Sequence, residues 1–325
     1  MNTRYAAPLL AMALAAPLAH AEPEKAPLNV VTTIGMIADV ASEVGGECVA
    51  AEPMMGPGVD PHLYQASASD VKTLRNADQI LYAGYSLEGQ LGEVLENFSR
   101  RKTTVAVSPE SIDLSRMLTA DDVYGIDPHV WMDVSLWAQT VDTIGETFIE
   151  ARPECKDSIQ ANAEAYTEQL GALHQWVKES VETIPEEQRI LVTAHDAFNY
   201  FGRAYGIEVE GIQGISTDTE TGIADIRHMA DTVIEREVPA VFIESTINPR
   251  TVQAVIDSAE QRGHEVVIGG QLYSDAMGKE GTADGTYIGM LRANTQAIVE
   301  ALGGEVAPLP DALASWAERW DLDEA

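Results

Sequence analysis

The sequence predicts an α/β protein of two lobes, each built on a four-stranded parallel sheet flanked by helices. Two blocks of the chain, 29–107 and 189–302, alternate short strand-like runs with helical stretches, and the 325 residues are enough for about two domains. Such alternation is typical of parallel sheets that helices cover on both faces. No strand pattern appears between the blocks, where the helical stretches contain little Gly or Ser. This middle region is therefore expected to connect two sheets and not to act as a flexible linker.

The first block is expected to contain four strands and three helices. The strands are 29–34, 48–55, 79–83 and 103–107, and the helices are 36–44, 69–76 and 90–98. The pair Gly45-Gly46 stops the first helix, because glycine tolerates the backbone conformation that ends a helix. The loops 56–66 and 108–128 are left without regular structure.

The middle region is expected to form two helical stretches. Asp133 can cap the first, which ends at Arg152-Pro153, and the second runs over 154–184. The first has an apolar stripe with spacings of 3, 4, 3 and 4, made of Val134, Trp137, Val141, Ile144 and Phe148. We assign 22–132 to the N-terminal lobe, 133–152 to the connecting helix and 153–325 to the C-terminal lobe with an acidic tail.

The second block repeats the alternation of the first. Its expected strands are 189–194, 207–212, 240–243 and 265–268, and its helices are 197–205, 222–237, 249–261 and 287–302. One short helix is expected in the tail, at about 312–320, and we assign the tail no role.

The first 21 residues have the pattern of a signal peptide. A positive start with Arg4 precedes the apolar run 6–18, and Ala19-His20-Ala21 is a typical cleavage site. The apolar run is too short to span a bilayer, and no later run of about 18 apolar residues follows. We expect cleavage after Ala21, no lipid anchor because no Cys follows that site, and export to a Gram-negative periplasm.

The acidic composition excludes some partners. The chain has a net charge of −32, and without Arg4 the mature form has 19 basic against 52 acidic residues, a net charge of −33. Such a chain repels nucleic acids and anionic membranes, so neither is an expected partner.

The two cysteines, Cys48 and Cys155, lie in a protein expected to reach an oxidising compartment. They either pair or remain as two buried thiols. A bond between them would tie the middle region to the first lobe. Neither belongs to a C-x-x-C motif, so a thiolate metal site is not expected.

A seven-residue motif occurs twice and presents a histidine each time. G-V-D-P-H-L-Y at 58–64 recurs as G-I-D-P-H-V-W at 125–131. Proline fixes its own φ and pushes the preceding Asp into extended geometry, so the backbone before His62 and before His129 is restricted. One copy alone would more often be an ordinary turn. A near-repeat favours a metal site, because metal ligands must be placed before the ion arrives.

Four candidate ligands follow strand ends. In open parallel sheets, ligands bind beyond the carboxyl ends of the strands. His62 follows the second predicted strand, His129 the fourth, His195 the fifth and Asp275 the eighth. Three imidazoles and one carboxylate suit Zn²⁺ and are acceptable to Mn²⁺.

Other polar residues receive weaker assignments. His20 leaves with the signal peptide, His174 and His228 are expected to be solvated or capping residues, and His264 a turn residue. Asp60, Asp127 and Asp196 adjoin the histidines and are expected to accept hydrogen bonds from the imidazoles. At least one of these three is expected to be a helix cap instead. Glu244 is the reserve metal ligand. The aromatic residues of the two motifs, Tyr64 and Trp131, are expected to be core, or walls that limit water access.

Several segments together resemble a known family. GVDPHLYQASASD, DPHVWMD, VTAHDAFNYFGRAYG, FIES and LYSDAMG are similar to motifs of the zinc/manganese branch of periplasmic solute-binding proteins, the TroA-like receptors of metal-importing ABC transporters. The resemblance runs from about 30 to 302. It implies two lobes joined by one long rigid helix, with the metal between the lobes on His62, His129, His195 and Asp275.

Two departures leave the metal open. Manganese-only members carry Glu where this chain has His195, and many zinc-only members have a His-rich loop that 108–128 lacks. We expect a monomeric receptor, not an enzyme, that takes Zn²⁺ or Mn²⁺ as cargo, binds no small organic substrate, and docks on the permease subunits of an ABC importer. The ATPase must be another chain, because no G-x-x-x-x-G-K-[ST] motif occurs. Since imidazoles bind metal only when neutral, the affinity is expected to fall as the pH drops through about 6.5.

Two rival functions remain. A secreted zinc metallohydrolase would need an open coordination position and a general base, and the chain has no H-E-x-x-H motif. A metal-dependent surface adhesin is disfavoured by the absence of a lipid anchor.

Overall fold

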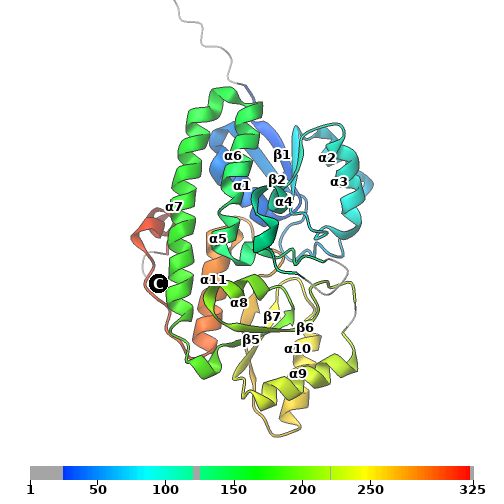
Figure 1. The fold of residues 1–325 in the computed structure, drawn as a ribbon, viewed down its shortest axis with the longest axis vertical. Coiled ribbons are helices and arrows are strands. Elements are labelled where there is room, and N and C mark those ends of the chain that lie inside the picture. Colours follow the sequence, from blue (N-terminus) through cyan, green and yellow to red (C-terminus); the bar gives the residue numbers. More distant parts are fainter. Residues whose placement is uncertain (1–24, 120–124, 220, 323–325) are drawn as a thin grey trace, which may run out of the picture.

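The protein is built of two α/β lobes stacked along its longest axis (Figure 1). The structure is a computed structural model that describes residues 25–119, 125–219 and 221–322. Each lobe has a four-stranded parallel sheet, with strand order β2-β1-β3-β4 in the first and β6-β5-β7-β8 in the second. The two sheets thus have the same topology, and the predicted fold class is confirmed. The predicted signal peptide, including His20, lies outside the described residues.

The first lobe follows the predicted alternation closely. Its strands are β1 (Leu28–Thr32), β2 (Val49–Pro53), β3 (Gln79–Tyr82) and β4 (Thr104–Ala106), and its helices are α1 (Gly35–Gly45), α2 (Ala68–Asn76), α3 (Gly92–Ser99) and α4 (Val107–Ser111). The short helix α4 was expected to be loop. Its Pro109 lies in the first turn, where a backbone N–H has no helical partner to lose.

The middle region contains three helices instead of two. They are α5 (Val134–Trp137), α6 (Thr140–Ala151) and α7 (Lys156–Val181). The predicted apolar stripe is entirely buried, although the chain leaves the helix at 138–139. The side chain of Asp133 accepts the backbone N–H groups of Ser135 and Leu136, so the predicted cap is confirmed.

The long helix that joins the lobes is α7. It packs on α1 of the first lobe, on α6 of the middle region, and on α8 (Asn199–Tyr205) and α11 (Tyr287–Ala301) of the second lobe. In Figure 1 it runs beside both lobes for most of their combined length. The domain boundaries at 132 and 152 stay a prediction.

The second lobe differs from the prediction mainly at its last strand. Its remaining elements are β5 (Ile190–His195), β6 (Glu208–Gln213), β7 (Ala240–Glu244), β8 (Val267–Leu272), α9 (Ile223–Glu235) and α10 (Arg250–Glu260). Strand β8 continues through Gly269 and Gly270, where the prediction ended it. A Cβ at Gly269 would lie 2.7–2.8 Å from Phe242 and Ala301, so glycine lets this strand pass beneath α11.

The acidic tail crosses from the second lobe back to the first. Trp176 of α7 donates its Nε1–H to the carbonyl of Ala307 at 2.8 Å. The tail helix α12 (Ala314–Arg319) buries Trp316, and Arg319 pairs with Glu43 of α1 at 2.8 Å. Among the described helices, none is both long and apolar enough to cross a membrane.

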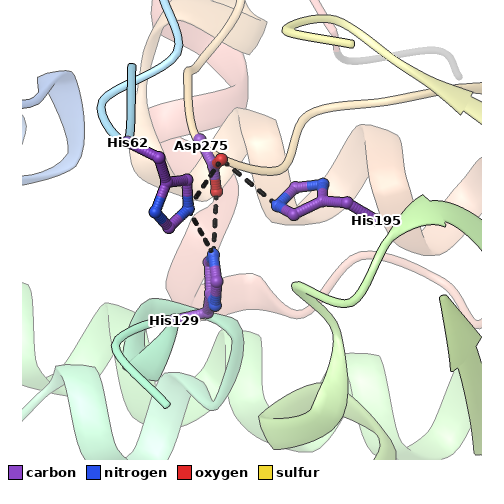
Figure 2. Close-up of side chains that lie close together, drawn as sticks. All are labelled: His62, His129, His195 and Asp275. Carbon is purple, nitrogen blue, oxygen red and sulfur yellow. Dashed lines mark hydrogen bonds and ion pairs between the residues drawn. The ribbon is translucent and has the colours of Figure 1, made fainter. Parts of the chain in front are cut away.

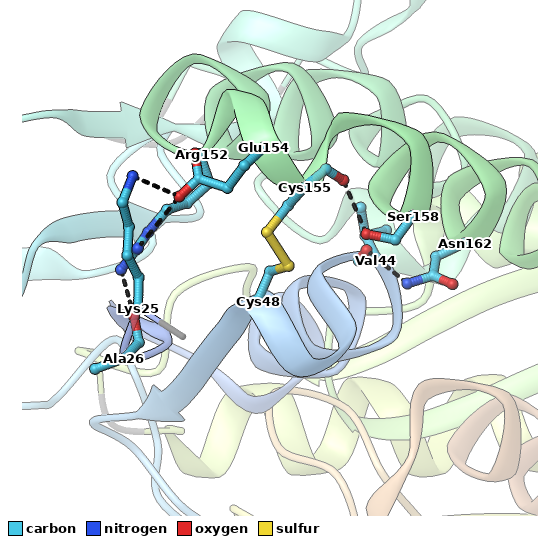
Figure 3. The surroundings of a disulfide bond; sticks show 9 residues. All are labelled: Lys25, Ala26, Val44, Cys48, Arg152, Glu154, Cys155, Ser158 and Asn162. Atoms are coloured by element: carbon cyan, nitrogen blue, oxygen red, sulfur yellow. Dashed lines mark hydrogen bonds and ion pairs between the residues drawn. A yellow bond between two sulfur atoms is a disulfide. The ribbon is translucent and has the colours of Figure 1, made fainter. Parts of the chain in front are cut away.

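A disulfide joins Cys48 and Cys155, with the two Cα atoms 6.4 Å apart (Figure 3). Cys48 ends the 3-10 helix before β2, and Cys155 ends the 3-10 helix before α7. The side-chain amide of Asn162 on α7 donates to the carbonyl of Val44 at 3.2 Å in the same region. The bond therefore fastens the long helix to the first lobe, at the edge of the sheet where β2 begins.

Candidate metal centre

His62 lies in the loop after β2 and is 2% exposed. The carboxylate of Asp60 accepts its backbone N–H at 2.9 Å, which fixes the turn through Pro61. Gly89 packs directly on this turn: a Cβ there would lie 2.7 Å from the His62 carbonyl oxygen, and its φ of +45° also favours glycine. The loop before α3 therefore supports the backbone that carries His62.

His129 occupies the same position in the second copy of the motif and is fully buried. Asp127 Oδ1 accepts its backbone N–H at 3.0 Å and lies 2.8 Å from its Nδ1. A ring nitrogen held by a carboxylate fixes the tautomer, so in the neutral ring Nε2 carries the lone pair.

Trp131 links the His129 turn to the second lobe. Its indole Nε1–H donates to the carbonyl of Ser274 at 2.9 Å, and its own carbonyl accepts the hydroxyl of Tyr287 at 2.7 Å. Trp131 is fully buried, so the expectation that it is core is confirmed.

His195 is the last residue of β5, and its neighbouring strand supplies its partner. Glu244, at the end of β7, accepts the His195 backbone N–H at 2.8 Å and pairs with Nδ1 through its other oxygen. Glu244, predicted as the reserve ligand, thus orients the His195 ring through Nδ1, while Nε2 faces Asp275. The sequence predicted such a role for Asp196, whose carboxylate instead interacts with the side chain of Asn199.

The Nε2 atoms of the three imidazoles converge on the carboxylate of Asp275 (Figure 2). Asp275 Oδ2 lies 3.5 Å from His62 Nε2 and 3.2 Å from His195 Nε2, and Oδ1 lies 3.2 Å from His129 Nε2. The Nε2 atoms of His62 and His129 are 3.3 Å apart. All four candidate ligand atoms lie within 4.8 Å of one another, so the structure brings together the four residues that the sequence selected.

Three buried polar atoms of this group lack the hydrogen bonds that such atoms normally make. Both oxygens of Asp275 and Nε2 of His195 are buried, yet they form no well-aligned hydrogen bond with any described residue. They approach one another at ion-pair distance only. Buried hydrogen-bond acceptors that face one common point, with no hydrogen-bond donor there, are typical of a cation site.

The carboxylates control the protonation of the imidazoles when no metal is bound. Burial by itself lowers the pKa of His129, but Asp275 and Asp127 together raise it more, to about 9. Burial likewise lowers the pKa of His195, and Glu244 and Asp275 outweigh it and raise that pKa well above the usual range. Burial raises the pKa of Asp275, but His195 and His129 hold it well below its usual value. Protons and a metal ion therefore compete for the same nitrogen atoms.

The remaining histidines lie elsewhere. His174 Nδ1 is 3.2 Å from the hydroxyl of Tyr205, His264 Nε2 is 3.3 Å from the carbonyl of Val238, and His228 lies on α9. No pattern in the sequence pointed to Thr217, which lies in a polar loop of the second lobe and donates its hydroxyl to Asp60 at 2.7 Å.

Comparison with known proteins agrees with this arrangement. The sequence model of ZnuA, the periplasmic component A of a zinc-uptake complex, matches residues 30–301. The chain belongs to this family. The ZnuA match ends before the acidic tail, and it confirms the resemblance found in the motifs.

Two relatives illustrate the range of metals. The chain is 45% identical to the manganese-binding lipoprotein MntA of Bacillus subtilis over 275 residues, which are 85% of this chain and 90% of MntA. It is 46% identical to the zinc-binding protein TroA of Treponema pallidum over 273 residues, 84% of this chain and 88% of TroA. The solved structure of that TroA superposes with a TM-score of 0.83 over 85% of this chain and 99% of TroA. The two names differ in their metal, so similarity to them leaves the metal of this chain open.

Proposed function

We propose that this chain is the metal-binding receptor of an ABC importer and carries one Zn²⁺ or Mn²⁺ ion as cargo between its lobes. The observation that supports this best is the buried group of three Nε2 atoms and one carboxylate, all within 4.8 Å of one another. Membership of the ZnuA family supports the same function.

The proposed ligands are Nε2 of His62, His129 and His195, and the carboxylate of Asp275. A tetrahedral ion with bonds of about 2.0–2.1 Å needs ligand atoms about 3.4 Å apart. The separations of 3.2–3.5 Å between Asp275 and the imidazoles, and of 3.3 Å between His62 and His129, agree with that requirement. These four contacts therefore have the spacing that a small divalent cation requires.

Each lobe contributes half of the proposed site. His62 and His129 come from the first lobe, and His195 and Asp275 from the second, so the ion bridges the lobes. All four residues are at most 2% exposed, so release of the ion requires the lobes to separate. In this proposal the monomeric receptor docks on the permease subunits, and ATP hydrolysis by another chain drives import.

The same geometry argues against the secreted hydrolase. A catalytic zinc site keeps a coordination position open for water or substrate. Here four protein ligands fill the shell of an ion in a group that is almost inaccessible to solvent. The proposal is therefore a receptor and not an enzyme, without a small organic substrate.

We place the receptor in the periplasm, with its signal peptide cleaved after Ala21. The positive start, short apolar run and A-x-A site support this, and the first cysteine of the chain is Cys48.

Metal uptake by a deletion strain tests the proposed function. Cells that lack this chain should accumulate less zinc or manganese from micromolar medium, and the metal that is affected is the cargo. Wild-type protein should restore uptake, His195→Ala should not, and His174→Ala should restore it as the matched control. Normal uptake of both metals in the deletion strain would contradict the proposal.

A further inference from the structure

We propose that Asp60 and Thr217 form a latch between the lobes that holds His62 in place and slows release of the ion. This latch rests on the proposed metal-binding function. It makes Thr217 a positioning residue, which acts on the ion through Asp60 and His62.

Asp60 uses its two oxygens for two different lobes. Oδ1 accepts the backbone N–H of His62 at 2.9 Å, within the first lobe. Oδ2 accepts the hydroxyl of Thr217 at 2.7 Å, from the second lobe. Proline between Asp60 and His62 keeps this turn stiff, so a displacement of the carboxylate also displaces the histidine. Thr217 is 7% exposed and Asp60 is half-buried, so the hydrogen bond is partly shielded from water.

Thr217 is fixed in turn to the strand beside His195. It lies in the loop between β6 and α9, and Gln213 at the end of β6 donates its amide to the carbonyls of Thr217 at 2.9 Å and Thr219 at 2.6 Å. Gln213 is the register partner of His195 in the neighbouring strand β5. A continuous set of contacts therefore joins His195 to His62 across the lobes without passing through the ion.

The second copy of the motif repeats the arrangement. Asp127 Oδ1 accepts the backbone N–H of His129 at 3.0 Å, and Asp127 Oδ2 accepts the amide of Asn199 of α8 at 3.3 Å. Each repeated aspartate thus binds its own histidine turn with one oxygen and a side chain of the second lobe with the other. The contact of Asp60 is the shorter of these two side-chain contacts.

The latch predicts a specific kinetic effect. The lobes must separate before the ion leaves, and separation breaks the Thr217–Asp60 hydrogen bond, whereas binding to the open form does not need it. Thr217→Val should therefore speed Zn²⁺ dissociation about tenfold, equivalent to about 1.4 kcal/mol, with an unchanged association rate. Thr217→Ala, which also removes the hydroxyl, should give the same increase, and Thr217→Ser should restore the wild-type rate.

Stopped-flow transfer of Zn²⁺ from the loaded, full-length mature protein to a chelating dye measures these rates. Thr219→Val is the matched control, because Thr219 is exposed on the same loop, and it should dissociate at the wild-type rate. Dissociation within twofold of wild type in both Thr217→Val and Thr217→Ala would overturn the latch. The latch would also be overturned if both variants melted at a lower temperature than wild type without metal and both bound Zn²⁺ more slowly. That pattern would indicate a purely structural role of Thr217. Failure of the wild type itself to bind Zn²⁺ or Mn²⁺ would instead overturn the proposed function.

Discussion

The indole of Trp131 donates to the carbonyl of Ser274 at 2.9 Å and so joins the turn of one proposed ligand to the residue before another. Trp131 lies two positions after His129, and Ser274 directly precedes Asp275. This hydrogen bond is buried and crosses from the first lobe to the second. It therefore helps to set where the Asp275 carboxylate lies relative to the imidazoles.

We predict that Trp131→Phe weakens metal affinity while the protein stays folded. The substitution keeps an aromatic ring but removes the Nε1–H, and a hydrogen bond of this kind contributes about 0.5–1.5 kcal/mol. The dissociation constant should rise by roughly two- to tenfold in competition titrations with Zn²⁺. Trp137→Phe is a close control, because Nε1 of Trp137 is buried without a hydrogen-bond partner among the described residues. Equal affinities of the two variants would show that Trp131 acts through packing alone.

Removing one imidazole from either lobe should have a similar effect. His62→Ala and His195→Ala each delete one of four proposed ligands, so both should weaken binding by orders of magnitude and to a comparable extent. The rise in melting temperature on adding metal follows affinity and should disappear in both. The controls are His174→Ala and His228→Ala, which remove histidines outside the group and should keep the full rise. A control that lost as much as His195→Ala would show that the ligands are assigned wrongly.

The sequence selected four residues that the structure brings together, because its signals are local. Most strands end near a change of composition, and parallel strands direct their carboxyl ends to one edge, so four candidate ligands could be chosen without knowing how the lobes meet. The partners of those ligands depend on the packing of distant segments. Glu244 and Asp196 had similar sequence contexts, and only the adjacency of β5 and β7 decides that Glu244 holds His195. Thr217 meets Asp60 from 157 positions away, and no periodicity records such a contact.

The same limit applies to parts of the fold. The stripe from Val134 to Phe148 predicted one continuous helix, because spacing reports which face is buried and not whether each backbone hydrogen bond forms. At β8 the prediction stopped at two glycines, because glycine weakens the interior of a strand. Here Gly269 is required by the close approach of α11, which the sequence alone does not reveal.

Metal affinity should keep increasing with pH well above 6.5. Each imidazole must be neutral to bind an ion, so a raised pKa means that protons compete up to a higher pH. The pKa of His129 is raised to about 9, and that of His195 also lies above its usual range. The prediction from the sequence used the ordinary histidine pKa of about 6.5. Affinity should therefore rise from pH 6 to about 9, and binding at pH 7 should release protons.

Calorimetry in buffers of different ionisation enthalpy measures that release directly. We expect between one and two protons per ion at pH 7, because His129 and His195 are the two rings whose pKa is raised. Glu244→Gln removes the charge behind His195 and should reduce the number released. An affinity that is flat from pH 6 to 9 would mean that these imidazoles are not ligands.

Loss of the disulfide should lower stability without changing metal affinity. The bond between Cys48 and Cys155 closes a loop with a sequence separation of 107, and cross-links over loops of this length stabilise a fold by about 2–5 kcal/mol. It lies where β2 begins, whereas His62 follows the other end of that strand. The double variant Cys48→Ser/Cys155→Ser should therefore melt several degrees lower than wild type under oxidising conditions. Its dissociation constant for Zn²⁺ should stay within twofold of wild type, and the wild type treated with a reductant should behave like the variant. A large loss of affinity at unchanged melting temperature would show that the bond acts on the lobes and not on the stability of the fold.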